Sequence, residues 1–197
     1  MARLYICRLL AAAAVLWVSL LWSQPALAEL NARASTTSPR LPQGIVRVTS
    51  SGVTQVLAGG TATCRTLTPA EARAALDTTN AIRAQRRLTP LAMNQKLQRA
   101  AEAHACDMAS RGVMTHQGAA GAGPTARVKQ NGYRPRLTAE NIAAGRFDLQ
   151  RVQQEWARSP GHLANILIKG ATDFGIGYAV GADGKTLFWA AIYANGK

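Results

Sequence analysis

The end of the chain carries the pattern that most restricts its fold. Residues 174–180 and 187–193 are two runs rich in aromatic and β-branched side chains, and a segment containing Asp183-Gly184 joins them. An Asp-Gly pair between two such runs is among the strongest local signals for a β-hairpin. The residues before them carry helical signals instead, so helices and strands are segregated along the chain. This order predicts an α+β fold.

Four helices are predicted upstream of this hairpin. The first begins at residues 68–71, where a threonine N-cap is followed by proline and then by an acidic residue in the first turn. The second follows Asn94, carries an apolar stripe at helical spacing and stops at Gly112. Two shorter helices are predicted over residues 121–132 and 149–156.

The first 28 residues, 1–28, are interpreted as a signal peptide. Arg3 and Arg8 precede an apolar run at residues 9–22, and a small-x-small cleavage motif ends at Ala28. The alternative is a membrane anchor, but the run has about 14 residues whereas a spanning helix needs about 20. Cleavage removes two arginines, which lowers the formal net charge from +13 to +11, and leaves no transmembrane segment in the mature chain. We therefore expect a secreted or periplasmic protein.

A polar arm at residues 29–63 is predicted to precede a single domain at residues 64–197. Within the arm, residues 45–48 and 53–57 flank a Gly-containing turn, which predicts a hairpin. Gly59-Gly60 separates this hairpin from the domain. About 130 residues suffice for one domain with its own core. We expect the domain to be a monomer and to fold without the arm.

Two cysteines, Cys64 and Cys106, remain after the leader is removed. An even pair in an oxidising compartment favours a disulfide, which would link the start of the first helix to the second helix. The alternative is a pair of buried thiols, because a free cysteine packs as a small apolar residue.

Three short blocks carry the candidate functional residues His116, Glu140 and His162. Two histidines and a glutamate in one cleft suit a borderline divalent cation such as zinc, with His116 and His162 as its ligands. The same residues can instead form a hydrogen-bonded cluster without a metal, in which the carboxylate orients an imidazole or accepts backbone N–H groups. Because Gly, Pro or Ala flanks each residue, we expect all three at the ends of elements, converging on one cleft.

The order of the blocks resembles a known family. The motifs that carry the resemblance lie at residues 79–83, 88–91, 103–109, 115–116, 140–143 and 159–167. Together they resemble the bacterial branch of the CAP superfamily, which takes in cysteine-rich secretory proteins, antigen 5 and pathogenesis-related 1 proteins and is also called the SCP-like family. The likeness runs from about Cys64 to the C-terminus.

The resemblance implies an α-β-α sandwich with a mainly antiparallel sheet between helices. It also implies a cleft with two histidines and two acidic residues, which in some members holds a divalent cation. His116, His162 and Glu140 match three of these positions. The second acidic residue has no direct match, and Glu155 is the acid nearest to it in the sequence.

Other polar and aromatic residues are interpreted as structural. His104 lies on the apolar stripe of the second helix and is expected in the core. Asn80 and Arg83 sit one helical turn apart and are expected to hydrogen-bond loop carbonyls. Trp156 and Trp189 are expected in the core.

Three classes of function remain open. In the first, a secreted module binds a small or lipidic ligand in the His/Glu cleft, with or without a divalent cation, and has no catalytic residue. The second is a metal-dependent hydrolase that uses the same cleft, although no serine or cysteine nucleophile has a recognisable motif. The third is a basic protein that adheres to anionic polymers of the cell envelope. Its arginines and lysines are spread out, so we expect no sequence-specific nucleic-acid binding.

Overall fold

The computed structural model describes residues 53–196, so the predicted signal peptide and the 45–48 half of the predicted hairpin lie outside the described residues. The helices within this part are α1 (Pro69–Ala84), α2 (Gln95–Arg111), α3 (Pro124–Gln130), α4 (Leu149–Arg158) and α5 (Pro160–Ile166). The strands are β1 (Val53–Gln55), β2 (Thr63–Arg65), β3 (Ala92–Met93), β4 (Val113–Thr115), β5 (Pro135–Gly145), β6 (Asp173–Val180) and β7 (Leu187–Gly196).

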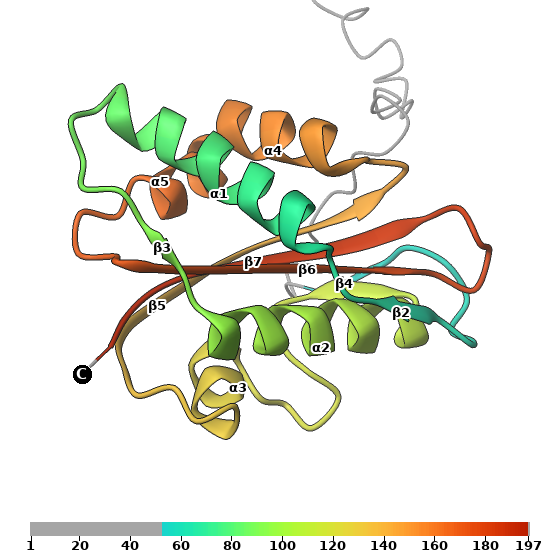
Figure 1. Cartoon of the computed structure of the whole chain (residues 1–197). Helices are drawn as coiled ribbons and strands as arrows, with labels where there is room; N and C mark the ends of the chain where they lie inside the picture. Colours follow the sequence, from blue (N-terminus) through green and yellow to red (C-terminus); the bar gives the residue numbers. More distant parts are fainter. Residues whose placement is uncertain (1–52, 197) are drawn as a thin grey trace, which may run out of the picture. The chain divides into compact units, whose positions relative to one another are not determined.

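One mainly antiparallel sheet forms the centre of the fold. Its strand order is β2-β6-β7-β5, and β3 pairs in parallel with the end of β6 that β2 leaves free. The predicted C-terminal hairpin is present as β6 and β7, which pair from Asp173 with Ala194 to Val180 with Leu187. The α1, α4 and α5 helices lie on one face of this sheet, and α2 and α3 lie on the other (Figure 1). The α+β fold and the sandwich predicted from the sequence are therefore confirmed.

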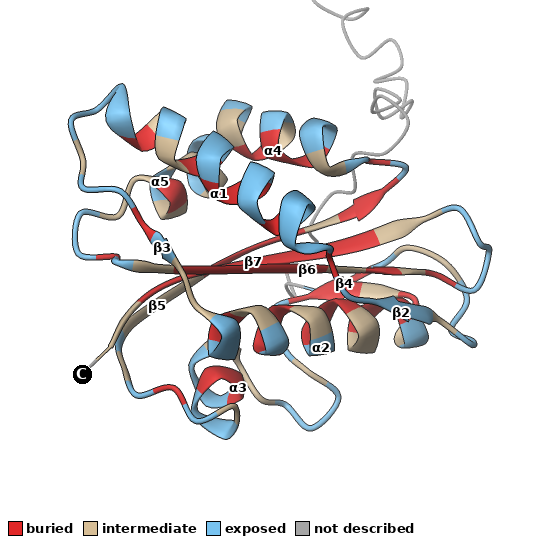
Figure 2. Ribbon diagram, viewed as in Figure 1, coloured by how far each residue is buried: buried red, intermediate tan, exposed pale blue. Residues whose placement is uncertain are grey.

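Both faces of the sheet are buried, which produces two apolar cores (Figure 2). Alternate residues of β7 point to opposite faces, as the twofold period of a strand requires. Phe188 and Ile192 pack toward α2, whereas Trp189 and Tyr193 pack toward α1 and α4. The central position of β7 explains why its sequence is almost continuously apolar.

Local signals set the ends of the first two helices as predicted. Thr68 and Glu71 form a reciprocal capping box at the start of α1, with Pro69 in its first turn. Asn94 caps α2 through a hydrogen bond from the Lys96 N–H. Gly112 ends α2 in the left-handed conformation at φ 66°, which glycine adopts without steric cost.

A disulfide joins Cys64 of β2 to Cys106 of α2, as predicted, with 5.1 Å between the Cα atoms. The bond closes a loop with a sequence separation of 42 residues. In the chain-entropy model, closing such a loop stabilises the fold by about 4 kcal/mol. The bridge fixes α2 to the edge of the sheet.

Two local structures differ from the sequence-based expectation. The segment around Pro160-Gly161, which is not among the helices predicted from the sequence, is the helix α5, with Pro160 at a first-turn position that suits proline. The predicted helix at residues 121–132 is present only over Pro124–Gln130. Both helices begin at a proline, whose fixed φ suits the first turn and whose missing N–H is not needed there.

The expected separation at Gly59-Gly60 is not seen, because residues 53–60 contact the domain. The β1 strand pairs with β4, and Val56 and Leu57 both donate backbone hydrogen bonds to the Gly112 carbonyl. Val56 and Leu57 also pack against the core under α2. The division of the chain at residue 64 stays a prediction. Within residues 53–196, no helix combines the length and apolar character needed to cross a membrane.

Candidate functional site

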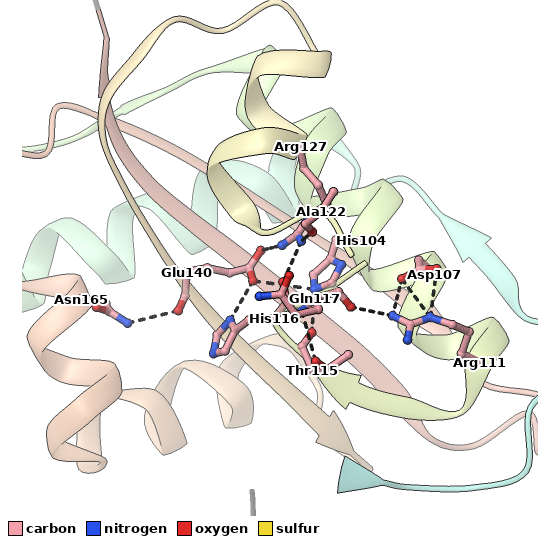
Figure 3. A network of polar contacts seen from close by, with 10 residues as sticks. All are labelled: His104, Asp107, Arg111, Thr115, His116, Gln117, Ala122, Arg127, Glu140 and Asn165. Atoms are coloured by element: carbon pink, nitrogen blue, oxygen red, sulfur yellow. Dashed lines mark hydrogen bonds and ion pairs between the residues drawn. The ribbon is translucent and has the colours of Figure 1, made fainter. Parts of the chain in front are cut away.

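A buried carboxylate lies at the centre of the candidate site. Glu140 was expected at the end of an element, but it lies in the middle of β5, where its backbone pairs with Ile192 of β7. Its side chain is 1% exposed and points to the side of the sheet that carries α2 and α3 (Figure 3). A charge at this depth is stable only when hydrogen-bonded and paired, and Glu140 has partners on both oxygens.

Arg127 of α3 supplies the main counter-charge. Its Nη2 atom lies 2.5 Å from Glu140 Oε2, and its side chain is 9% exposed. Its Nη1 atom donates to the His116 carbonyl at 2.8 Å and to the Ala122 carbonyl at 2.5 Å. One guanidinium therefore neutralises the carboxylate and fixes the loop that carries His116.

His116 faces the other oxygen of the same carboxylate. It follows β4 directly, and its Nδ1 atom lies 2.8 Å from Glu140 Oε1. Because a carboxylate accepts, Nδ1 carries the proton of the neutral ring, and the Nε2 lone pair is left for a ligand. The side chain is 48% exposed, so solvent reaches about half of the surface of the ring.

Burial raises the pKa of Glu140, but the hydrogen bond from His116 and the charge of Arg127 outweigh it, so that the pKa lies below its ordinary value. The carboxylate is therefore ionised at neutral pH. Glu140 acts on the site through His116, because both of its oxygens are occupied by protein groups.

His104 completes the buried cluster from α2. It is a core residue, as predicted, at 1% exposure, and its Nε2 atom donates to the Thr115 carbonyl at 2.9 Å. Its Nδ1 atom is buried without a hydrogen-bond partner. Burial lowers the pKa of His104 to about 4, against the weaker opposing effect of Glu140. The ring is therefore neutral at physiological pH.

A set of amide hydrogen bonds ties the backbone around His162 to β5. Asn141, beside Glu140, donates to the His162 carbonyl at 3.0 Å. Asn165, one turn after His162, donates to the Glu140 carbonyl at 3.1 Å and to Asn141 Oδ1 at 2.8 Å. These bonds dock α5 on β5, and they explain why asparagines accompany both the glutamate and the histidine in the sequence.

The charges that act on His162 include that of His116. Burial lowers the pKa of His162, and the positive charge of His116 lowers it further. His162 therefore favours the neutral form, in which a ring nitrogen can accept a proton or bind a cation.

Glu155 has other partners. It lies on α4 and forms ion pairs with Arg151 at 2.6 Å and with Arg158 at 4.0 Å. Both arginines are on the same helix, at the spacing of neighbours on a helix surface. The structure places Glu155 in this ion-pair network on α4, whereas Glu140 is the acid that contacts His116.

The donor set for a metal is small. Within residues 53–196, no group of three or more His, Cys, Asp or Glu side chains has the arrangement of a metal site. Glu140 is committed to His116 and Arg127, which leaves two imidazoles, those of His116 and His162. A zinc ion there would need water or a ligand at its remaining positions, so the residues fit a weak, open site and not a structural one.

The chain matches the model of the cysteine-rich secretory protein family, named CAP, over residues 76–193. This match covers more than half of the chain. The chain belongs to the CAP family.

Relatives of this CAP domain come from several bacteria. The Bacillus subtilis protein YkwD is 33% identical over 103 residues, which are 52% of this chain and 40% of YkwD. The structure of a Bacillus anthracis extracellular protein containing an SCP domain has a TM-score of 0.57 and 27% identity, over 66% of this chain and 44% of that one. The chain thus spans less than half the length of both.

The fold of the CAP domain also resembles that of an outer surface protein from Borrelia burgdorferi. That comparison gives a TM-score of 0.60 and 21% identity, over 70% of this chain and 99% of that one. At this identity the likeness concerns the fold alone. The solved relatives are extracellular or surface proteins by name.

Arg127 is the site residue of this CAP domain that the sequence did not indicate. It was counted among scattered basic residues, because an arginine on a short helix is usually exposed. The nearest signal is its place in the Gly-rich segment between His116 and Glu140, which is short enough to return to both.

Proposed function

We propose that the protein is an exported binding module whose cleft holds a small ligand through the imidazoles of His116 and His162, with a divalent cation as one such ligand. The observation that carries this proposal is the fixed orientation of His116. Its Nδ1 atom is held 2.8 Å from a buried carboxylate while half of the ring is exposed. Such a ring keeps its Nε2 atom aimed without loss of side-chain freedom on binding.

Catalysis is not part of the proposal, because the cleft has a binding nitrogen and no nucleophile. The side-chain hydrogen bond of His116 goes to the Glu140 carboxylate, and not to a serine, threonine or cysteine. Nucleophilic hydrolysis needs such a pair. Metal-assisted hydrolysis needs a general base near the open position, and the buried Glu140 is already held by Arg127.

The test is a zinc titration of the mature protein, followed by NMR of the imidazole nitrogens. At pH 7 we expect the Nε2 signals of His116 and His162 to shift together, with a weak dissociation constant. The effect should fade toward about pH 5, where imidazoles protonate and release the cation. Either single variant, His116→Ala or His162→Ala, should lose most of the binding.

The His104→Asn variant is the matched control, because it removes an imidazole outside the open part of the cleft. It should bind zinc as the unchanged protein does. Equal zinc responses in the His116→Ala and His162→Ala variants and in the unchanged protein would refute the shared cleft. Ester or peptide hydrolysis that requires both histidines would favour the hydrolase instead.

A further inference from the structure

A small pocket of about 190 Å³ is lined by α2, α3 and the loop at residues 118–122. Neither His116, Glu140 nor His162 lines it, so it is distinct from the histidine cleft. The exposed residues at its rim include three alanines, Ala103, Ala119 and Ala120. A cavity of about 150 Å³ holds one benzene molecule. The pocket therefore has room for a ligand of about six non-hydrogen atoms.

His104 brings an unused acceptor to this pocket. It lines the pocket from α2 and is 1% exposed. Its Nε2 atom donates to the Thr115 carbonyl at 2.9 Å, so Nδ1 of the neutral ring carries a lone pair. This Nδ1 atom is buried and has no hydrogen-bond partner in the part of the chain that the structure describes. Buried polar atoms in folded proteins are almost always paired, and a ligand that donates a hydrogen bond would pair this one.

Arg127 brings an unused donor to the same pocket. Its side chain is 9% exposed, and its two terminal nitrogens donate to Glu140 and to two loop carbonyls (Figure 3). Its Nε–H group is buried and has no acceptor among residues 53–196. The adjoining Cδ atom lies beside the pocket, because a Cβ atom added at Gly118 would be 3.9 Å from it. The pocket thus offers one acceptor and one donor that the protein leaves unpaired.

The charges around the pocket are balanced. Asp107 also lines it, and its carboxylate is paired with Arg111 Nη2 at 2.5 Å. Arg127 is paired with Glu140, and His104 is neutral at pH 7, because burial lowers its pKa to about 4. The pocket therefore favours a neutral ligand. A carboxylate has about four lone-pair sites, so Asp107 can still accept a hydrogen bond from such a ligand.

A hydroxyl group meets the requirements of both unpaired atoms. It can donate its hydrogen to His104 Nδ1 while its oxygen accepts from Arg127 Nε–H. A carboxylate has no hydrogen to donate, and an ammonium group has no lone pair with which to accept. A second hydroxyl on the neighbouring carbon would have the Asp107 carboxylate as its acceptor.

We propose that this pocket binds a neutral polyol about the size of glycerol, with one hydroxyl between His104 and Arg127 and the next one on Asp107. The alanine rim then contacts the carbon atoms of the polyol. The site goes beyond the histidine cleft, and it does not require the cleft to bind anything.

The experiment is an NMR titration of the mature protein with glycerol, which follows the nitrogen signal of His104 Nδ1 and the amides of α2, α3 and residues 118–122. The comparison probes are propan-1-ol, which has one hydroxyl, and acetate, which is an anion. We expect saturable shifts with glycerol, affinity about fivefold lower for propan-1-ol because one hydrogen bond is lost, and none with acetate. Shifts that never saturate, or equal affinities for glycerol and propan-1-ol, would overturn the proposal, because the pocket would then hold water and an adventitious additive only.

Methyl glucoside identifies the source of the polyol. It carries neighbouring hydroxyls on a sugar ring that is larger than the pocket, so that only one edge of the ring can enter. Saturable binding of glucoside and glycerol would indicate that the pocket takes the edge of a sugar unit, and binding of glycerol alone would indicate a free polyol. Binding of neither would refute the site.

Two substitutions of His104 test the role of Nδ1. The His104→Gln side chain can keep the donor to Thr115 and has no group at the position of Nδ1, so its affinity for glycerol should fall about tenfold. The His104→Asn side chain keeps a polar group at the position of Nδ1 and loses the bond to Thr115. It should bind glycerol more tightly than His104→Gln does, and the reverse order would contradict the proposed contact.

A second pair of variants leaves the polar groups unchanged. Ala103→Leu extends a side chain of α2 over the pocket and should weaken glycerol binding about tenfold by steric exclusion. Ala74→Leu makes the same change at an exposed position of α1, on the other face of the sheet, and should leave the affinity unchanged. Equal affinities in these two proteins would overturn the location of the site.

The His116→Ala protein separates the pocket from the histidine cleft. It should bind glycerol with unchanged affinity while it loses zinc. Loss of glycerol and zinc together would place the polyol in the cleft and refute the pocket.

Discussion

Glu140 keeps a negative charge inside the protein because its neighbours share it. Arg127 and His116 each contact one oxygen, and His104 Nε2 lies 3.7 Å from Oε1. The cluster draws its members from β5, α3, α2 and the loop after β4. At the residue scale, the ion pair between Arg127 and Glu140 therefore holds the ring of His116 in one orientation.

Arg127→Met should destabilise the protein strongly, because it leaves a buried carboxylate without its counter-charge. Loss of one partner of a buried pair costs about 3–5 kcal/mol. Urea unfolding at pH 7 measures this change. Arg73→Met breaks an exposed pair on α1 and should cost less than about 1 kcal/mol.

The double variant Arg127→Met plus Glu140→Gln then tests the cause. Replacing the carboxylate by an amide should recover part of the lost stability, since burying an uncharged amide costs less free energy than burying an unpaired charge. No recovery would mean that Arg127 stabilises the fold by packing and by its bonds to loop carbonyls.

His104 should make the protein less stable as the pH falls from neutral. The unfolded chain binds a proton near pH 6.5, whereas the folded protein does so only near pH 4, because burial lowers the pKa of this ring. The stability is therefore fully present above about pH 6.5 and is lost between these values, by roughly 3 kcal/mol at about 1.4 kcal/mol per pH unit.

Urea unfolding at several pH values between 7 and 4 measures this loss. The His104→Asn protein has no ring at this position and should show a shallower pH dependence, even if it is less stable at pH 7. Identical slopes in the two proteins would assign the acid sensitivity to other groups, such as His162, whose pKa is also lowered by burial.

At the scale of elements, the contact of α2 with the sheet depends on glycine. A Cβ atom at Gly175 of β6 would lie 2.3 Å from the Gln98 nitrogen, and one at Gly177 would lie 2.4 Å from the Glu102 nitrogen. The helix backbone therefore rests directly on the strand. Because Gly175 and Gly177 have no side chain beyond a hydrogen atom, α2 can lie this close to β6. The close packing of α2 also brings His104 over β5.

Gly175→Ala should cost about 3 kcal/mol, at the upper end for overpacking, because α2 must move away from the sheet. Gly161→Ala on α5 is the matched control, since nothing lies within 4 Å of its added Cβ, and alanine favours a helix. Thermal unfolding compares the two. A similar melting temperature for both would show that α2 can shift without cost.

At the scale of the whole molecule, the question is where the folded unit begins. The Gly112 carbonyl accepts from the backbone of Val56 and Leu57, and a Cβ at Gly112 would lie 2.2 Å from the Leu57 oxygen. The segment before β2 thus covers the C-terminal end of α2. The sequence predicts that the domain folds without this segment, and its contacts lead us to expect that its removal lowers the stability of the domain.

A chain that starts at Thr61 should melt about 5–10 °C below the mature protein. It loses β1 and the burial of Val56 and Leu57, which we expect to contribute about 2–3 kcal/mol. A chain that starts at Val53 keeps these contacts and is the matched control, with an unchanged melting temperature expected. Equal melting of the two shortened chains would restore the boundary predicted near residue 64.

Much of this architecture could be predicted from the sequence because its signals are local. The Thr68 and Asn94 caps, the stop at Gly112 and the Asp183-Gly184 turn each act within a few residues, and each appears where it was predicted. Arg83 likewise donates to carbonyls of the loops, including that of Thr89. The order of the motifs indicated the CAP fold.

The rest required the tertiary structure, because it depends on residues that are distant in the chain. Arg127 is buried where α3 packs over Glu140, and Asn141 and Asn165 help to hold α5 against β5. The spacing of apolar residues and the capping residues indicate whether a segment prefers helix or strand. They do not indicate which partner a charged side chain will contact. The sequence by itself determined the elements and the chemistry available. Packing alone decided that one arginine and one carboxylate would meet inside the protein and leave His116 oriented toward solvent.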